Sequence, residues 1–233
     1  MNELLLLLSL IISYGSVLIW FRLFGKEGMY CFTILATIMA NIEVLALVNA
    51  FGIEMTLGNI LFATTFIATD ILSETEGKKC ANKAVKLGIA TSATFIIVSR
   101  LWLYYIPSSN DMALTAIKQL FASTPRIMVA SFLVYAVAQA LDVYLYHKIW
   151  EYTEKRYKSR KSLLWVRNNV ATISSQLINS VLYNLLAFYG IYSSEILGNI
   201  IISTFAISII TSLLDTPIIY CARYIAERQK ESQ

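Results

Sequence analysis

The sequence predicts an all-α, polytopic membrane protein with six to seven transmembrane helices in a single integral membrane domain that spans residues 1–233. Of its 233 residues, 57% are hydrophobic and 15% are charged, whereas soluble domains carry about 25% charged residues. The apolar runs are long and continuous, without the alternation that a membrane β-barrel needs. Since a hydrocarbon core of about 30 Å takes roughly 20 residues of helix, this length leaves no room for an additional soluble domain.

Seven segments are apolar enough to be membrane helices. The run at 4–8 lacks the basic n-region and small-residue cleavage site of a signal peptide, so we expect it to belong to a retained first helix. The third segment carries Asp70 and Glu74 in its last turns but is otherwise apolar from Leu57 to Leu72. The predicted helices lie near 4–21, 30–51, 56–75, 82–106, 121–150, 165–190 and 195–221, and 222–233 is predicted to be a cytoplasmic tail.

The charges between these segments alternate along the chain. The second, fourth and sixth segments are followed by loops whose charges are Glu54, Asp111 and Glu195, with Lys118 at the start of the next helix. The other loops and the tail are basic, and their cations are Arg22, Lys26, Lys78, Lys79, Lys83, Lys86, Lys148, Lys155, Arg156, Lys158, Arg160, Lys161, Arg167, Arg223, Arg228 and Lys230. Basic loops stay in the cytoplasm, so the pattern predicts an outside N-terminus and a cytoplasmic C-terminus.

Polar side chains recur at helical spacing inside several segments. In the fifth segment Tyr135, Gln139, Asp142 and Tyr146 are spaced by 4, 3 and 4 residues, so they share one face. Similar stripes include Thr37 and Asn41 in the second segment, Thr65 to Glu74 in the third, Asn168 to Tyr183 in the sixth and Thr204 to Asp215 in the seventh. Such residues can hydrogen-bond between helices or converge on a solute. Intramembrane charges are costly, and together with the amides they favour a substrate site that includes Gln139, Asp142, Gln176 and Asn179.

Arg126 and Pro217 mark two helix positions with more than one interpretation. Arg126 follows Pro125 in the first turn of the fifth predicted helix. It either pairs with a carboxylate and gates access from outside, or snorkels to the interface. Pro217 lies two residues after Asp215 and would kink the last helix, leaving carbonyl groups free near that carboxylate.

The sequence lacks the residues that several classes of protein require. Cys31, Cys80 and Cys221 are isolated, and His147 is the single histidine, so neither a zinc site nor a hydrolase triad is indicated. No phosphate-binding loop is present, and we expect no cofactor and no nucleic-acid partner. Two alternatives remain open: a membrane enzyme that uses Asp70 and Glu74 as metal ligands or as acid and base, and a non-catalytic scaffold or channel.

Three blocks of sequence resemble one known family. The first is Phe66-Ile-Ala-Thr-Asp70-Ile-Leu-Ser-Glu74 followed by Gly77-Lys78-Lys79, and the second runs from Arg126-Ile-Met-Val-Ala-Ser131 to Tyr135-Ala-Val-Ala-Gln139-Ala-Leu-Asp142. The third is Ser174-Ser-Gln-Leu-Ile-Asn179-Ser, leading to Leu186-Ala-Phe188. They resemble the queuosine precursor transporters, also called the vitamin uptake transporter family. This resemblance implies import of 7-deazaguanine bases (the 7-cyano and 7-aminomethyl precursors, or queuine) through a bacterial inner membrane for tRNA modification.

The chemistry of a deazapurine suits these side chains. A carboxylate can accept from the exocyclic amine and a ring N–H, Gln or Asn can bind the carbonyl edge, and a tyrosine ring can stack on the base. We expect substrate contacts from Asn41, Glu43, Asp70, Tyr135, Gln139, Asp142, Gln176 and Asn179, and gating or coupling by Glu74, Arg126 and Asp215.

Two energy sources remain open. The protein is either a secondary carrier in which Glu43, Asp70 or Glu74 changes protonation, or the substrate-binding subunit of an energy-coupling-factor importer with an external ATPase module. Ala36 and Ala40 would allow close packing of a partner helix, and a homodimer is also compatible with the sequence.

Overall fold

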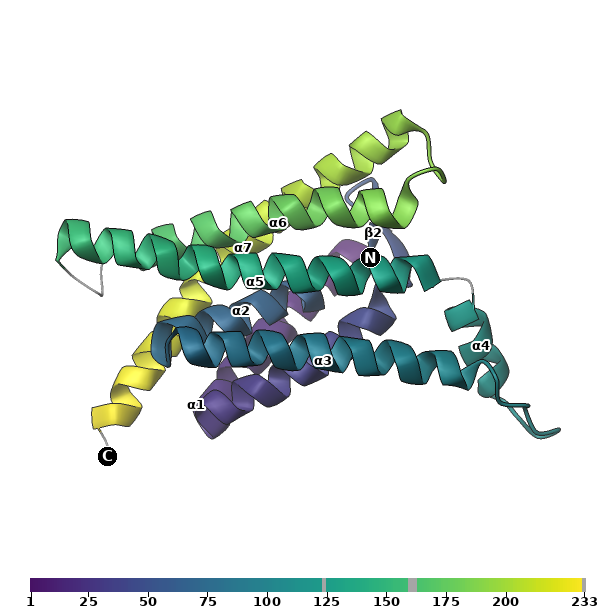
Figure 1. Ribbon diagram of the computed structural model, residues 1–233, viewed down its shortest axis with the longest axis horizontal. Coiled ribbons are helices and arrows are strands. Elements are labelled where there is room, and N and C mark those ends of the chain that lie inside the picture. The colour runs from purple at the N-terminus through teal and green to yellow at the C-terminus, as the bar shows by residue number, and fades with distance from the viewer. Residues whose placement is uncertain (123–124, 159–162, 232–233) are drawn as a thin grey trace.

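The protein is a bundle of long helices with one small β-hairpin (Figure 1). The computed structural model describes residues 1–122, 125–158 and 163–231. This confirms the all-α class predicted from the sequence. The elements are α1 (Asn2–Glu43), β1 (Leu47–Ala50), β2 (Ile53–Thr56), α2 (Asn59–Thr75), α3 (Lys78–Trp102), α4 (Leu114–Ala122), α5 (Pro125–Tyr157), α6 (Leu164–Phe188) and α7 (Ser194–Glu231).

Within the described ranges, four helices are long and apolar enough to cross a membrane, namely α1, α3, α5 and α7. Large apolar side chains such as Leu4, Leu133 and Ile202 are exposed on their outer faces. Exposed apolar surface of this extent suits contact with lipid. The protein is therefore a multi-pass membrane protein, while the predicted count of membrane crossings stays a prediction.

Helix α1 reverses direction in its middle. Gly25 has φ 55° and ψ −137°, which interrupts the helix and favours glycine. A straight helix of 42 residues would span about 60 Å, yet Asn2 Nδ2 donates to the Asn49 carbonyl oxygen at 2.8 Å. The rings of Trp20 and Phe32, twelve positions apart, lie 5.8 Å from each other. The two halves of α1 therefore run in opposite directions, as the predicted segments 4–21 and 30–51 require.

The second predicted segment is wrong beyond residue 43. Residues 44–51 were expected to continue a helix, but β1 and β2 pair as an antiparallel hairpin, with Leu47 opposite Thr56. Phe51 (φ 56°) and Gly52 (φ 75°) form its two-residue turn. Positive φ at both central residues matches the twist of paired strands, and the apolar composition of this stretch suits a strand as well as a helix.

Other helix boundaries also differ from those expected. The fourth segment, placed at 82–106, is α3 at Lys78–Trp102, and it begins directly after Gly77, which has φ 87°. The fifth, placed at 121–150, is divided between α4 and α5, and residues 123–124 lie outside the described part. The tail expected at 222–233 continues α7 to Glu231, and 232–233 are also outside it.

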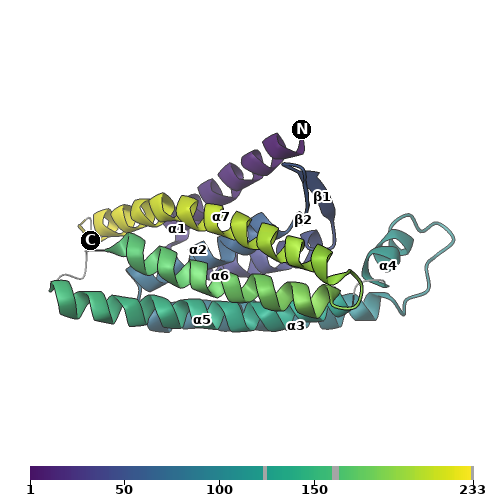
Figure 2. The ribbon, with the colours of Figure 1, turned by 90° about the horizontal axis from the view of Figure 1, so that it is seen from above.

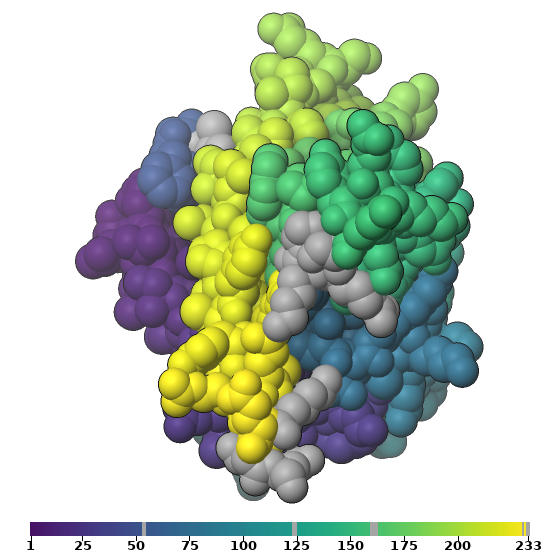
Figure 3. Space-filling view, turned by 90° about the vertical axis from the view of Figure 1, so that its left-hand side faces the viewer, coloured from purple at the N-terminus to yellow at the C-terminus, as the bar shows by residue number. Residues whose placement is uncertain are grey.

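The helices run alternately between two ends of the bundle (Figures 1 and 2). The hairpin end contains β1, β2 and α4. The basic end contains the α2–α3 turn and the C-terminal turns of α5 and α7, and Figure 3 looks onto it with the last turns of α7 in yellow. Toward this end Tyr14, Phe21, Phe32, Ile71 and Ile219 belong to one buried apolar cluster from α1, α2 and α7. This packing leaves a cavity nearer the hairpin end.

Candidate functional site

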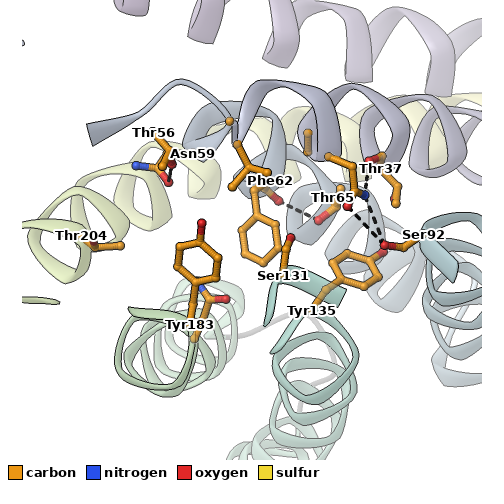
Figure 4. Close-up of a pocket in the computed structure, with 15 residues that line it drawn as sticks. Thr37, Thr56, Asn59, Phe62, Thr65, Ser92, Ser131, Tyr135, Tyr183 and Thr204 are labelled. Atoms are coloured by element: carbon orange, nitrogen blue, oxygen red, sulfur yellow. Dashed lines mark hydrogen bonds between the residues drawn. The ribbon is translucent and has the colours of Figure 1, made fainter. Parts of the chain in front are cut away.

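A narrow pocket, partly open to the surroundings, lies among α1, α2, α3, α5, α6 and α7 (Figure 4). Three of the site residues predicted on separate helices line this pocket together, namely Asn41, Tyr135 and Asn179. The complete lining is Thr37, Ala40, Asn41, Val44, Thr56, Gly58, Asn59, Phe62, Thr65, Ser92, Ser131, Tyr135, Asn179, Tyr183 and Thr204.

Amide side chains in and behind the pocket wall are held in place by hydrogen bonds. Asn41 Nδ2 donates to the Thr37 carbonyl oxygen at 2.8 Å and to Ser92 Oγ at 3.2 Å. Asn179 Nδ2 donates to Gln176 Oε1 at 3.2 Å. Gln176 therefore stands behind Asn179 instead of lining the pocket itself.

Gln139 occupies a layer behind the opposite wall. Its Nε2 donates to Thr65 Oγ1 at 2.8 Å, and its Oε1 accepts from Thr69 Oγ1 at 3.2 Å. Gln139 is fully buried and is not among the lining residues. It therefore orients Thr65, whose side chain does reach the pocket.

Aromatic rings form one side of the pocket. In Figure 4, Phe62, Tyr135 and Tyr183 extend into the same space, and Phe62 meets Tyr135 edge-on with ring centroids 6.0 Å apart. The Tyr183 hydroxyl is buried and finds no hydrogen-bond partner among the described residues. Because buried hydroxyl groups are normally paired, this one is available to a bound solute. The sequence stripe on the sixth segment contained Tyr183 but did not distinguish it.

Tyr135 depends on a glycine in the neighbouring helix. A Cβ atom built on Gly88 of α3 would lie 1.9 Å from the Tyr135 hydroxyl oxygen. That distance is far below any van der Waals contact, so only glycine leaves room for this position of the ring.

Three carboxyl groups lie deeper than the pocket, on three different helices. Asp70, Asp142 and Asp215 are at most 1% exposed. Thr172 Oγ1 donates to Asp70 Oδ2 at 3.3 Å, Ser175 Oγ donates to Asp142 Oδ1 at 2.9 Å, and the Tyr14 hydroxyl donates to Asp215. Thr172 and Ser175 lie one turn apart on α6, so Asp70 and Asp142 are neighbours. None of the three lines the pocket.

A second polar cluster closes the bundle toward the basic end. Arg167 is fully buried, and its Nη2 lies 2.6 Å from Glu74 Oε2 and 2.7 Å from Oε1. The Tyr146 hydroxyl donates to Glu74 Oε2 at 2.8 Å, and the Arg167 guanidinium lies 4.1 Å from a Trp150 ring centroid. Arg223 Nη1 is 3.4 Å from Glu74 Oε1. The cluster therefore joins α2, α5, α6 and α7.

The sequence placed Arg167 among the loop cations and missed this role. Its position three residues into α6 (Leu164–Phe188), next to the polar stripe that starts at Asn168, was the signal that it belongs to the bundle.

Two further predicted site residues lie elsewhere. Glu43 is half-buried at the last position of α1 and does not line the pocket. Arg126 Nε donates to the Leu186 carbonyl oxygen at 2.6 Å, and its Nη2 donates to that of Tyr189 at 2.7 Å. Arg126 thus ties the start of α5 to the end of α6. Within the described residues, no group of three or more His, Cys, Asp or Glu side chains could hold a metal ion.

Comparison with known proteins gives the same family as the sequence blocks. Residues 56–222 match the model of the family described as "Putative vitamin uptake transporter". The chain is also 36% identical over 222 residues to a protein of Bacillus subtilis (strain 168) named "Probable queuosine precursor transporter", with 95% of each chain covered. No solved structure matches. The matched family and the Bacillus relative are both named as transporters, so the protein is a transporter and not an enzyme, and the chain belongs to the vitamin uptake transporter family.

Proposed function

We propose that this protein imports queuosine precursors, the 7-deazaguanine bases with a 7-cyano or 7-aminomethyl group or queuine, across a bacterial cytoplasmic membrane. The printed name of the Bacillus relative supports this substrate class. The observation that carries the proposal is the chemistry of the pocket lining, which combines aromatic rings with fixed amide groups and the unpaired Tyr183 hydroxyl.

A deazaguanine fits the chemistry of this pocket. The flat bicyclic ring stacks on Phe62 or Tyr183, since aromatic faces favour offset stacking. Its carbonyl edge accepts hydrogen bonds and its amine donates them. Asn179 has one N–H and its side-chain oxygen available, whereas Asn41 offers its side-chain oxygen because both of its N–H groups are already used. The Tyr183 hydroxyl supplies one further donor and acceptor.

The pocket assigns different tasks to the predicted residues. Asn41, Tyr135 and Asn179 keep their proposed contacts with the base. Gln139 and Gln176 position Thr65 and Asn179 from behind. The predicted contact from Asp142 is replaced by a role below the pocket, because its carboxyl group faces Ser175 and Asp70.

The orientation follows from charge. Lys78, Lys155, Arg156 and Arg223 all lie at the basic end, and positive residues flank the cytoplasmic side of membrane proteins. We therefore place the basic end in the cytoplasm and the N-terminus outside. We further propose that the Glu74–Arg167 ion pair separates the pocket from the vestibule at the basic end, as in an outward-facing state of an alternating-access cycle.

The proposal is tested in bacteria that can neither make nor import these bases. The chain is expressed, each base is supplied at low concentration, and queuosine in tRNA is detected by its slower migration on a boronate gel. Wild-type protein should restore the slow band with at least one base. No slow band with any base, despite membrane expression and co-expression of an energy-coupling ATPase module, would refute the proposed substrate.

Tyr183→Phe supplies the test at the level of the site. Loss of one hydrogen bond with a buried hydroxyl costs about 1 kcal/mol, so the base concentration needed for half-maximal uptake should rise about fivefold. Tyr220→Phe is the matched control, because Tyr220 is exposed on α7. Equal uptake by both variants would remove the Tyr183 hydroxyl from the substrate site.

A further inference from the structure

Within the described residues, no cation forms an ion pair with the buried carboxyl groups below the pocket. Asp70 and Asp142 are fully buried, where an isolated anion is very unfavourable. The nearest buried cation, Arg167, already makes a two-pronged contact with Glu74. Neutralisation of the Asp70–Asp142 pair therefore has to come from a source other than this arginine.

The hydrogen bonds of the pair indicate what that source is. Asp70 Oδ2 accepts from Thr172 and Asp142 Oδ1 accepts from Ser175. The remaining oxygens, Asp70 Oδ1 and Asp142 Oδ2, find no hydrogen-bond partner among the described residues. Because Thr172 and Ser175 lie one turn apart on α6, the two carboxyl groups to which they donate are neighbours. Two carboxylates are acceptors only, so a hydrogen bond between them requires a proton on one. Two neighbouring carboxylates repel each other, and sharing one proton removes that repulsion.

Two unsatisfied polar atoms continue from the pair toward the basic end. Ser73 Oγ and Asn168 Oδ1 are fully buried and find no partner within the described chain. Ser73 is three positions after Asp70 on α2, and Asn168 is four positions before Thr172 on α6, so each lies one turn further along the same face. Buried unpaired polar atoms at such a site can bind a water molecule, which would carry a proton onward.

We propose that the protein is a proton–substrate symporter whose proton site is the Asp70–Asp142 pair. This inference rests on the proposed import function and adds its second transported species. A proton suits the site, because a hydrogen bond between two neighbouring carboxyl groups needs a donor and only a protonated carboxyl group supplies one.

The proton site is connected to the substrate pocket by a short chain of contacts. Thr65 lines the pocket and accepts from Gln139, whose Oε1 accepts from Thr69. Thr69 directly precedes Asp70. A base that shifts Thr65 therefore shifts the residue beside the proton site, which couples occupancy of the two sites.

On the cytoplasmic side the proton site adjoins the closing cluster. Glu74 follows Asp70 by one helical turn and is bound by Arg167 and Tyr146. The other titratable groups facing the carboxyl pair are Asp215 on α7 and its partner Tyr14 on α1. An open vestibule at the basic end adjoins the cluster. Its lining includes Glu74 itself, Lys78 of α3 and His147 of α5.

The proton balance of one cycle is simple. In the outward-facing state a proton from the outer medium binds a carboxylate oxygen of the pair and removes one negative charge from the interior. After the base has bound, the Glu74–Arg167 cluster separates, and the same proton leaves to cytoplasmic water along Ser73 and Asn168. The restored negative charges then favour return of the empty protein to the outward-facing state.

The first arm of the test uses purified protein in liposomes with radiolabelled 7-cyano-7-deazaguanine. Counterflow without a pH gradient measures exchange of the base, and an inward gradient of one pH unit, with the membrane potential clamped, measures coupling. One proton per base gives about tenfold accumulation, because one pH unit corresponds to a tenfold ratio. In the wild-type protein, gradient-driven accumulation divided by accumulation in counterflow should be about ten. In Asp70→Asn and Asp142→Asn this quotient should fall to about one. Glu195→Gln changes an exposed carboxyl group at the other end and should leave the quotient at about ten.

The second arm needs no substrate. Infrared difference spectra of the purified protein near neutral pH should show the carbonyl band of a protonated carboxyl group, with a shift in heavy water. Both Asn variants should lose this band, and Glu195→Gln should keep it. Absence of the band in the wild-type protein, its persistence in both Asn variants, or counterflow without gradient-driven accumulation would overturn the symport proposal. Absence of counterflow with 7-cyano-7-deazaguanine, and with unlabelled 7-aminomethyl-7-deazaguanine or queuine as the exchanged base, while the band is present, would instead overturn the proposed substrate.

Discussion

The closed basic end depends on one buried ion pair, and Arg167→Met is the change that tests it. Arg167 is fully buried and Glu74 is 3% exposed in its side chain. Methionine keeps much of the volume of the arginine stem but removes the guanidinium, so Glu74 keeps only Tyr146 at 2.8 Å and Arg223 at 3.4 Å. A buried carboxylate would then be short of its main partner.

The size of the effect follows from this geometry. Removing one partner of a buried ion pair costs about 3–5 kcal/mol, and Arg223 compensates in part, which places the cost near the lower value. About 3 kcal/mol corresponds to a factor on the order of 100 in a conformational equilibrium. The closed state should lose that factor against states in which the basic end is open.

Cysteine labelling measures this equilibrium directly. Ser73 is fully buried just inside the cluster, so Ser73→Cys in a background with Cys31, Cys80 and Cys221 replaced by alanine reports opening. In inside-out vesicles a membrane-impermeant maleimide should label it up to 100-fold faster when Arg167→Met is added. Arg156→Met removes an exposed cation of α5 at the same end and should leave the rate unchanged.

A double variant separates a gate from general loosening. Glu74→Gln together with Arg167→Met removes both charges, and a neutral replacement of a buried pair is often well tolerated. Labelling of the double variant should fall at least tenfold below that of Arg167→Met alone. Equal labelling of the single variant and the parent, or of the double and single variants, would refute the assignment of this pair as the closing contact.

Two further changes test other parts of the structure. Gly88→Ala places a Cβ against the movable end of Tyr135, so the protein should still fold. Its affinity for the base, measured by equilibrium binding, should fall about tenfold, since overpacking costs about 1–3 kcal/mol. Gly198→Ala meets open space and is the control; equal affinities of the two variants would contradict the role of Tyr135. Backbone N–H groups at the start of α4 donate to Asp111 and lower the pKa of its carboxyl group. The stabilisation of α4 by this cap is therefore complete above the usual aspartate pKa, and it is lost as the pH falls through the lower pKa of the folded protein. The protection factors of the α4 amides, relative to intrinsic exchange at the same pH, should therefore fall in that acidic range in the parent but be low already at neutral pH in Asp111→Ala. Identical protection factors in the two proteins would exclude the cap.

Much of the fold and the chemistry of the site can be predicted from local pattern. Apolar runs of membrane length define the helices because the bilayer demands them, and spacings of three and four residues show that Gln139 and Asp142 share a face. Composition alone did not separate helix from strand at 47–56, because short apolar runs suit both. There the positive φ angles at Phe51 and Gly52 decide the local structure.

The positions of polar groups relative to one another came only from the tertiary structure. Asn41 and Asn179 line one pocket although 138 positions separate them in the sequence, and Asp142 turns from that pocket toward Asp70. Arg167 resembles any loop cation until Glu74 and Trp150, from two other helices, surround it. Helical spacing is a property of one segment and can be deduced from sequence, whereas the energy of a buried charge depends on which segments pack beside it.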